Sequence, residues 1–107
     1  MKSLVIIPTY NEIENIKNIV LSVLEKKDNF DVLIVDDSSP DGTSKVVEDI
    51  KKDYKNRLYL MIRQGKNGLG TAYIDGFKWA IKYQYDYIFE MDADFSHDPD
   101  DLPRLLY

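Results

Sequence analysis

Two acidic residues separated by a single alanine follow an apolar segment late in the chain. Asp92 and Asp94 flank Ala93 directly after the apolar segment at residues 87–91. Alternate residues at a strand end can bring two carboxylates within reach of one point once the strand relaxes into a loop. Carboxylate oxygens are hard ligands that suit Mg²⁺ or Mn²⁺, and such an ion can hold a diphosphate. Most isolated Asp-x-Asp triplets are solvated turns, but the position after a buried strand favours a metal and phosphate site.

A second acidic pair, Asp36 and Asp37, follows the apolar run at residues 32–35. In nucleotide-binding folds an acid at the end of the second strand is a usual partner of the ribose. We therefore predict that one of the pair faces a ligand crevice, and we assign this role to Asp37. Asp41 is predicted to be structural, because it or Thr43 can cap the next helix.

A third polar segment, residues 8–12, ends the first apolar run. Asn11 is predicted to cap the first helix, with Glu14 three residues later as in a capping box. The N–H groups at the start of that helix would then be available to an anion. Tyr10 either stacks on a base and closes a pocket or is partly buried in the core.

A glycine-containing loop at residues 65–70 matches neither the Walker pattern nor the dinucleotide-binding fingerprint. Its glycines are predicted to permit a tight turn and close packing of the following helix. Arg63 and Lys66 are interpreted as solvated charges, although either could face a diphosphate. His97, the single histidine, lies near the acidic pair in the sequence, which leaves a role beside a metal open.

Short apolar runs alternate with helical patterns, which predicts an α/β fold with a parallel sheet and helices on both faces. Strands are predicted at residues 4–7, 32–35, 58–62 and 87–91, each followed by a helix. Right-handed crossovers and the motif positions predict the spatial strand order 3-2-1-4. Because the carboxyl ends of parallel strands meet at one edge, Asp37, Asp92 and Asp94 should lie together there. The third helix is expected to turn one face inward, at Ala72, Gly76, Phe77, Ala80 and Ile81.

The 107 residues are enough for one domain with one core. A net charge of −5 argues against non-specific binding to nucleic acid, and the absence of cysteine excludes disulfides and thiolate metal sites. The first apolar run, Leu4–Ile7, is too short for a signal sequence or a membrane span. The chain ends on Leu105-Leu106-Tyr107, and its fourth strand would be unpaired at an edge. We therefore expect residues 1–107 to be the N-terminal part of a larger fold.

Four segments, taken together and in order, resemble glycosyltransferases of family 2, and among these most closely the dolichyl- and polyprenyl-phosphate mannose synthases. The segments are Pro-Thr-Tyr-Asn-Glu at residues 8–12, Asp-Asp-Ser-Ser-Pro-Asp-Gly-Thr at 36–43, Gly-Leu-Gly-Thr-Ala-Tyr-Ile-Asp-Gly at 68–76 and Met-Asp-Ala-Asp-Phe-Ser-His-Asp-Pro at 91–99. The resemblance covers essentially the whole chain. It implies a GT-A fold, of which residues 1–107 would form the Rossmann-like, nucleotide-sugar-binding half, without the acceptor-binding part.

The resemblance also implies an activity. The expected reaction is the metal-assisted transfer of mannose from GDP-mannose to a polyprenyl or dolichyl phosphate, with inversion at the anomeric carbon and Mg²⁺ or Mn²⁺ as cofactor. A full-length protein of this kind would be cytoplasmic, at the cytoplasmic face of a membrane, with membrane association through a region beyond Tyr107. No nucleic-acid partner is expected.

The resemblance assigns roles to individual positions of this sequence. Asp94 is the expected catalytic residue, and the expected metal ligands are Asp92, Asp94 and Ser96. The expected nucleotide-sugar site consists of Pro8, Tyr10, Glu12, Val35, Asp37, Asp92, Ala93 and Asp94. Two positions depart from the family pattern: Ser96 stands where archaeal relatives often have Gln, and Glu90 stands in a strand that is usually apolar there.

Three other interpretations stay open at the level of sequence. The chain could be a nucleotide-binding module without catalytic activity, or a family 2 transferase that uses another donor such as UDP-glucose. A receiver-like signalling domain also gathers acids at strand ends, but it needs an acidic pair after its first strand and an acceptor Asp after its third. Here those strands end in Pro-Thr-Tyr and Arg-Gln, which disfavours the receiver.

Overall fold

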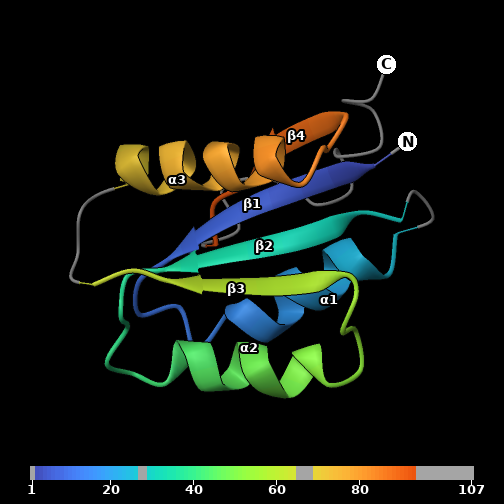
Figure 1. Cartoon of the computed structure of the whole chain (residues 1–107). Coiled ribbons are helices and arrows are strands. Elements are labelled where there is room, and N and C mark those ends of the chain that lie inside the picture. Colours follow the sequence, from blue (N-terminus) through green and yellow to red (C-terminus); the bar gives the residue numbers. More distant parts are fainter. Residues whose placement is uncertain (1, 27–28, 65–68, 94–107) are drawn as a thin grey trace.

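The structure, a computed structural model, describes residues 2–26, 29–64 and 69–93, which form one sheet with helices on both faces (Figure 1). The elements in chain order are β1 (Ser3–Thr9), α1 (Ile16–Leu24), β2 (Asp31–Asp36), α2 (Thr43–Lys51), β3 (Leu58–Ile62), α3 (Leu69–Lys82) and β4 (Tyr87–Glu90). The predicted alternation of strands and helices is confirmed. The helix predicted after Pro99 lies outside the described residues.

The four described strands are parallel and lie in the order β3-β2-β1-β4, which confirms the predicted order (Figure 1). The central strands β1 and β2 are buried along almost their whole length, because helices cover both faces of the sheet. β1 is longer than predicted and continues through Pro8 to Thr9, which lie beside Val35 and Asp36 of β2.

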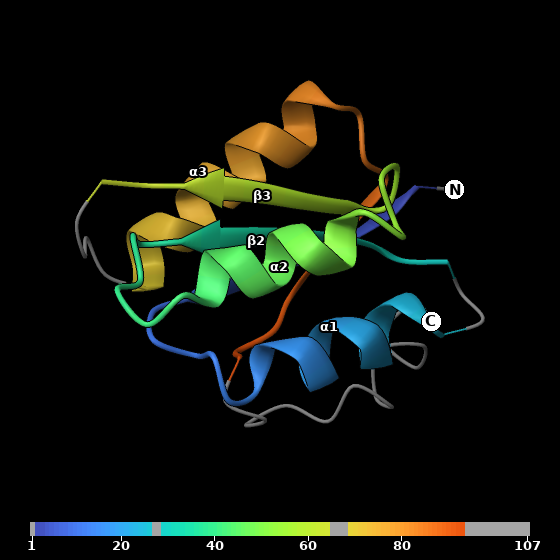
Figure 2. The same ribbon diagram turned by 90° about the horizontal axis from the view of Figure 1, so that it is seen from below.

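Helices α1 and α2 cover one face of the sheet and α3 covers the other, as the two views show together (Figures 1 and 2). On the α1 and α2 side, the fully buried Phe30 meets Phe89 edge to face, with ring centroids 5.6 Å apart. On the other side, Ala72 and Ala80 of α3 pack in a second core layer with Ile6 of β1. In the part of the chain that the structure describes, no helix has both the length and the apolar character needed to cross a membrane.

Close packing of α3 on β1 depends on a glycine. A Cβ atom added at Gly76 would lie 2.7 Å from Cγ2 and 3.0 Å from Cδ1 of the fully buried Ile6. We expect Gly76→Ala to lower the free energy of unfolding by about 1–2 kcal/mol, because overpacking outweighs the better helix propensity of alanine. Urea unfolding measures this loss. The matched control is Gly70→Ala, whose Cβ would meet nothing within 4 Å, and it should not destabilise. Equal stability of the two variants would contradict the packing argument.

The predicted capping box at Asn11 and Glu14 is wrong. The first helix begins later, at Ile16, with Asn15 as its N-cap residue, and the Asn15 side chain makes no capping hydrogen bond. Asn11 adopts a left-handed backbone conformation with φ of 56°, which continues the loop rather than starting a helix. The backbone of this loop is held by side chains from another loop, which the local pattern could not reveal.

The predicted inward face of α3 is correct except at its last position. Ala72, Gly76 and Ala80 are buried and Phe77 is partly buried, but Ile81 is 71% exposed. Residues four apart line one helix face, and the next residue is rotated by about 100° from it. Ile81 therefore lies outside the interface, although its neighbour Ala80 packs in it.

Candidate functional site

The alternation of side chains in the strands decides which acids can share a site. Val35 of β2 and Ile88 of β4 pack in the core layer beneath α3. Side chains two positions apart in a strand point to the same face. The face covered by α3 therefore continues to Asp37, two residues after Val35, and to Asp92, four residues after Ile88. The hydrogen bonds of Asp37 with Arg63, which is itself bonded to α3, and of Asp92 with Tyr73 of α3 support this placement.

Asp36 points the other way and has a structural role. Its carboxylate accepts hydrogen bonds from the Thr9 hydroxyl at 2.6 Å, from the Ser39 amide at 2.9 Å and from the Ser39 hydroxyl at 2.6 Å. Only 1% of Asp36 is exposed. Of the acidic pair, Asp37 is therefore the member that can turn toward a ligand crevice, as predicted.

Asp37 forms a buried, two-pronged ion pair with Arg63, the residue directly after β3. Nε of Arg63 lies 2.6 Å from Oδ1 of Asp37, and Nη2 lies 2.9 Å from Oδ2, with both side chains 7% exposed. The hydrogen bonds that the guanidinium donates to Asp37 raise the pKa of Arg63 above its ordinary value, against the effect of desolvation, which lowers it. The interpretation of Arg63 as a solvated charge is therefore wrong.

Arg63 also joins the sheet to the start of α3. Its Nη1 donates to the Thr71 hydroxyl at 3.1 Å and to the Asp75 carboxylate at 3.0 Å. The 43% exposure of the Asp75 side chain lets water solvate that carboxylate as well. One guanidinium thus holds the end of β2, the end of β3 and the first turns of α3 together, which fixes the orientation of the Asp37 carboxylate.

The loops after β1 and β2 are fastened to each other by three hydrogen bonds. The amide of Asn11 donates to the Ser39 hydroxyl at 2.9 Å, that of Glu12 to the Thr43 hydroxyl at 3.1 Å, and that of Ile13 to the Asp41 carboxylate at 3.1 Å. These N–H groups have side-chain acceptors already. The expectation that the backbone amides after β1 would receive an anion is therefore not supported at these three residues.

Asp41 is structural, as predicted, but neither it nor Thr43 is the N-cap residue of α2, so the capping prediction is wrong in its position. Oδ1 accepts hydrogen bonds from the amide and the hydroxyl of Thr43, the first residue of α2, while Gly42 is the N-cap residue in a left-handed conformation. Desolvation raises the pKa of Asp41, but hydrogen bonds from Thr43 and Ile13 outweigh it and hold the pKa below its usual value. Asp41 thus stays ionised and fastens the two loops.

Asp92 lies just beyond β4 and is held by α3. The hydroxyl of Tyr73 donates to Oδ1 of Asp92 at 2.8 Å, and the carboxylate is only partly buried. Ala93 is 4% exposed and packs in the core on the α1 and α2 side, so its methyl group lies away from the Asp92 carboxylate. Asp37 and Asp92 are therefore acids from two strand ends that the fold brings to the α3 face of the carboxyl edge.

The remaining predicted site residues occupy different depths of this edge. Val35 is fully buried and Pro8 is buried, whereas Tyr10 and Glu12 are partly exposed. Asp94 and Ser96, together with Lys66 and His97, lie outside the described residues. Within residues 2–26, 29–64 and 69–93, no group of three or more His, Cys, Asp or Glu side chains could hold a metal ion. Asp92 is thus the one predicted metal ligand whose surroundings the structure describes.

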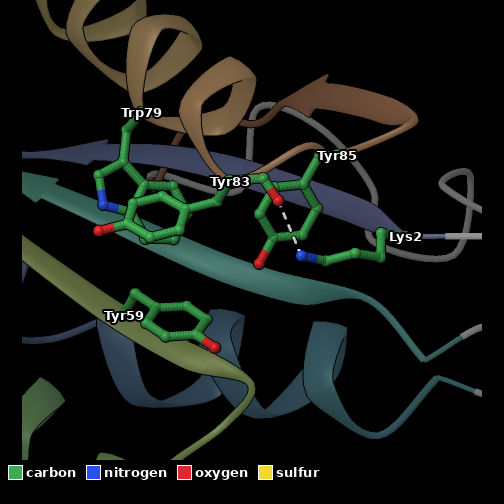
Figure 3. Close-up of a pocket in the computed structure, with 5 residues that line it drawn as sticks. All are labelled: Lys2, Tyr59, Trp79, Tyr83 and Tyr85. Carbon is green, nitrogen blue, oxygen red and sulfur yellow. Dashed lines mark hydrogen bonds between the residues drawn. The ribbon is translucent and has the colours of Figure 1, made fainter.

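A hollow of about 280 Å³ lies at the other end of the sheet (Figure 3). It is lined by Lys2, Tyr59, Trp79, Tyr83 and Tyr85. Nζ of Lys2 donates to the Tyr83 carbonyl at 2.8 Å and lies 4.4 Å from the centre of the Tyr85 ring. Burial, and a hydrogen bond to Asp31, raise the pKa of the Tyr85 hydroxyl. Because Lys2 precedes β1 and Tyr59 lies near the start of β3, this hollow is not part of the carboxyl edge.

The family model of glycosyl transferase family 2 matches residues 4–107. The chain belongs to this family. It is 46% identical over 105 residues to polyprenol monophosphomannose synthase of Mycolicibacterium smegmatis, covering 98% of this chain and 40% of that protein. It is also 46% identical over 106 residues to undecaprenyl-phosphate mannosyltransferase of Micrococcus luteus, covering 99% of this chain and 43% of that protein. The chain thus spans about two fifths of the length of these relatives.

Solved glycosyltransferase structures share the fold. The mannosyltransferase PcManGT from Pyrobaculum calidifontis, in complex with GDP-Man and Mn²⁺, matches with a TM-score of 0.69 and 26% identity, over 87% of this chain and 27% of that one. TarS 1-349 of S. aureus, in complex with UDP-GlcNAc, matches with a TM-score of 0.74 and 28% identity, over 99% of this chain and 30% of that one. The predicted α/β architecture of a GT-A transferase is confirmed.

Sequence reasoning missed four side chains of the site. Arg63, Thr71 and Asp75 form the network around Asp37, and Tyr73 holds Asp92. One signal was available for Arg63: it follows a strand directly, as Asp37 does, so both had to lie at the same edge. No local pattern marks Tyr73, because its partner is 19 residues away.

Proposed function

We propose that this chain supplies the donor-binding part of a glycosyltransferase that moves mannose from GDP-mannose to a polyprenyl phosphate, with inversion. The observation that carries the proposal is the placement of Asp37 and Asp92 on one face of the carboxyl edge, each held by a hydrogen bond from another element. Ligands of open α/β sheets bind in the crevice beyond this edge. The names of the two similar transferases support mannose as the sugar and a polyprenyl phosphate as the acceptor.

The two acids would serve different parts of the donor. Asp37 is the proposed acceptor for N–H or O–H groups of the nucleoside, since the guanidinium of Arg63 holds its carboxylate in one orientation. Tyr10 and Glu12, partly exposed in the loop after β1, would line the same nucleotide pocket. Val35, Pro8 and Ala93 are buried and would form the floor and wall behind these polar contacts.

A divalent cation fits the donor set at the end of β4. The Asp92 carboxylate is a hard oxygen ligand at the ligand-binding edge, and Asp94 and Ser96 would complete the protein's share of the ligands. Such an ion is worth several kcal/mol when it neutralises charge on a departing phosphate. The PcManGT complex, which contains GDP-Man and Mn²⁺, supports this assignment. We propose Mg²⁺ or Mn²⁺.

The proposed reaction needs no general base from this chain. A phosphate monoester has a second pKa of about 6, so the acceptor oxygen is mostly ionised at neutral pH. The task left to the protein is to hold two anions in reacting geometry. The acceptor-binding part of the protein, and its contact with the cytoplasmic face of a membrane, are proposed to lie beyond the 107 residues.

Binding of the cation and of GDP should be coupled. Few protein carboxylates are available, so most of the octahedral shell of the ion must come from water and phosphate. We expect calorimetry to detect weak Mn²⁺ binding by the protein alone and clearly tighter binding with GDP present. Asp92→Asn should remove most of this gain. Tight Mn²⁺ binding without GDP, or an unchanged gain in Asp92→Asn, would count against the assignment.

An assay of mannose transfer tests the proposed function directly. The full-length protein is incubated with labelled GDP-mannose, Mg²⁺ and a polyprenyl phosphate, and labelled glycolipid is the expected product. A parallel reaction with labelled UDP-glucose identifies a different donor. Binding of GDP-mannose without any product would instead indicate a module that binds nucleotide but does not catalyse. The 107-residue chain alone is expected to bind GDP weakly and to form no glycolipid, because it lacks the part proposed to hold the acceptor.

A further inference from the structure

The first half of α3 is linked to both acids of the proposed site, directly to Asp92 and through Arg63 to Asp37. Thr71 and Asp75 hold the Arg63 guanidinium that clamps Asp37, and Tyr73, between them in the sequence, donates to Asp92. The two acids come from strands that are not neighbours, because β1 lies between β2 and β4. A single helix therefore ties together two acids that the sheet alone would leave on separate strands.

We infer that Tyr73 is a positioning residue for Asp92. Its hydroxyl fixes the Asp92 carboxylate in the orientation in which that group meets a divalent cation and a diphosphate. The inference rests on the proposed function, and it adds a residue outside the predicted nucleotide-sugar site to that function. Because Arg63 is anchored on the same turns of α3, movement of this helix would displace both acids together.

The phenol of Tyr73 suits this role for two physical reasons. Its ring packs in the core layer beneath α3, which limits the positions open to the hydroxyl. The hydroxyl donates a hydrogen bond at 2.8 Å and adds no charge. Arg63, in contrast, brings a full positive charge to Asp37. Tyr73 can therefore orient Asp92 without weakening the attraction of that carboxylate for a cation.

A carboxylate can accept a hydrogen bond and bind a cation at the same time. Its two oxygens offer about four acceptor positions, and the Tyr73 hydroxyl donates to Oδ1. Groups that hold metal ligands in place typically contribute a factor of about 10–100 to metal affinity. The loss of one neutral hydrogen bond to a partly exposed acid should fall at the lower end of this range.

The experiment compares Tyr73→Phe with the wild type in the full-length protein. With GDP present, the dissociation constant for Mn²⁺ should rise about tenfold. GDP affinity measured in EDTA should change less than about twofold, because the nucleoside contacts at Asp37 are untouched. If Tyr73→Phe only disturbed the fold, the affinity for Mn²⁺ and the affinity for GDP would both fall. Tyr59→Phe is the matched control, since its hydroxyl donates to the Asn56 carbonyl near the start of β3. This control should leave both affinities unchanged.

A second measurement needs neither metal nor nucleotide. In the metal-free protein, Tyr73→Phe should shift the carboxyl carbon-13 resonance of Asp92, and Tyr59→Phe should not. An unshifted Asp92 resonance, or an unchanged Mn²⁺ affinity in Tyr73→Phe, overturns the inference. If the wild type binds neither GDP nor Mn²⁺, the proposed function fails and the role toward a cation fails with it. The resonance then shows separately whether Tyr73 holds Asp92.

Discussion

Replacing Arg63 with methionine is expected to lower the free energy of unfolding by about 3–5 kcal/mol, which is the usual cost of breaking a buried ion pair from one side. The Asp37 carboxylate, whose side chain is only 7% exposed, would lose the guanidinium that now compensates its charge. The loss of the Arg63 partner would cost less at Asp75, because its side chain is 43% exposed and water can solvate it. Urea unfolding measures the loss, and GDP affinity should fall with it, because Asp37 would no longer be held.

The ion pair on α2 provides the control for this prediction. Lys52 and Asp49 lie 3.4 Å apart, with both side chains 76% exposed, so Lys52→Met should cost less than about 1 kcal/mol. The double variant Asp37→Leu/Arg63→Met should recover much of the stability lost in Arg63→Met, since it removes the stranded charge as well. If Arg63→Met and Lys52→Met unfold at the same urea concentration, the pair is not buried as described.

The layout of the fold was predictable because it depends on local patterns and on one general rule. A β-branched run at residues 32–35 and an apolar run at residues 58–62 mark strands, and helical spacing between the runs marks crossovers. Right-handed crossovers, together with the positions of the motifs, then predict the strand order that is observed. The two-residue period of a strand even separates Asp36 from Asp37, since neighbouring side chains point to opposite faces.

The contacts that complete the site depend on the folded chain and could not be predicted in the same way. Arg63 looks like an exposed charge at a loop, and only the fold reveals that it meets Asp37, which is 26 residues earlier. The capping prediction for Asn11 failed for the same reason. The side chain of Ser39, 28 residues away, accepts the hydrogen bond of the Asn11 amide and helps to hold this segment as a loop. Local propensity is a weak guide where a distant side chain offers a better partner.

The distribution of charge along the carboxyl edge gives the two acids different chemistry. Asp37 carries its charge against a guanidinium, so it is suited to orient hydrogen-bond donors. Asp92 receives a hydrogen bond from a neutral phenol, which restrains it but brings no charge of its own. This contrast is the physical reason to assign the nucleoside to the first acid and the cation with the diphosphate to the second.

The largest effect on activity is expected for Asp92. In the full-length protein, Asp92→Ala should reduce kcat/KM for mannose transfer at least about a thousandfold, which corresponds to roughly 4 kcal/mol of transition-state stabilisation. The variant loses a carboxylate that would hold the cation and, through it, the diphosphate that must leave. The Tyr73 hydroxyl would also lose its acceptor on Asp92. Steady-state rates with labelled GDP-mannose and a polyprenyl phosphate, at saturating Mg²⁺, provide the measurement.

His97→Ala is the contrasting variant, because it removes the one histidine near the acidic motif in the sequence. If the acceptor phosphate reacts as an already ionised oxygen, no side chain has to remove a proton, and this variant should keep most of its kcat. Its rate should then depend on pH as the wild-type rate does. A loss in His97→Ala as large as that in Asp92→Ala would mean that the histidine acts as a base or a ligand. Holding the cation that neutralises the leaving diphosphate could then no longer be the main contribution of this segment to catalysis.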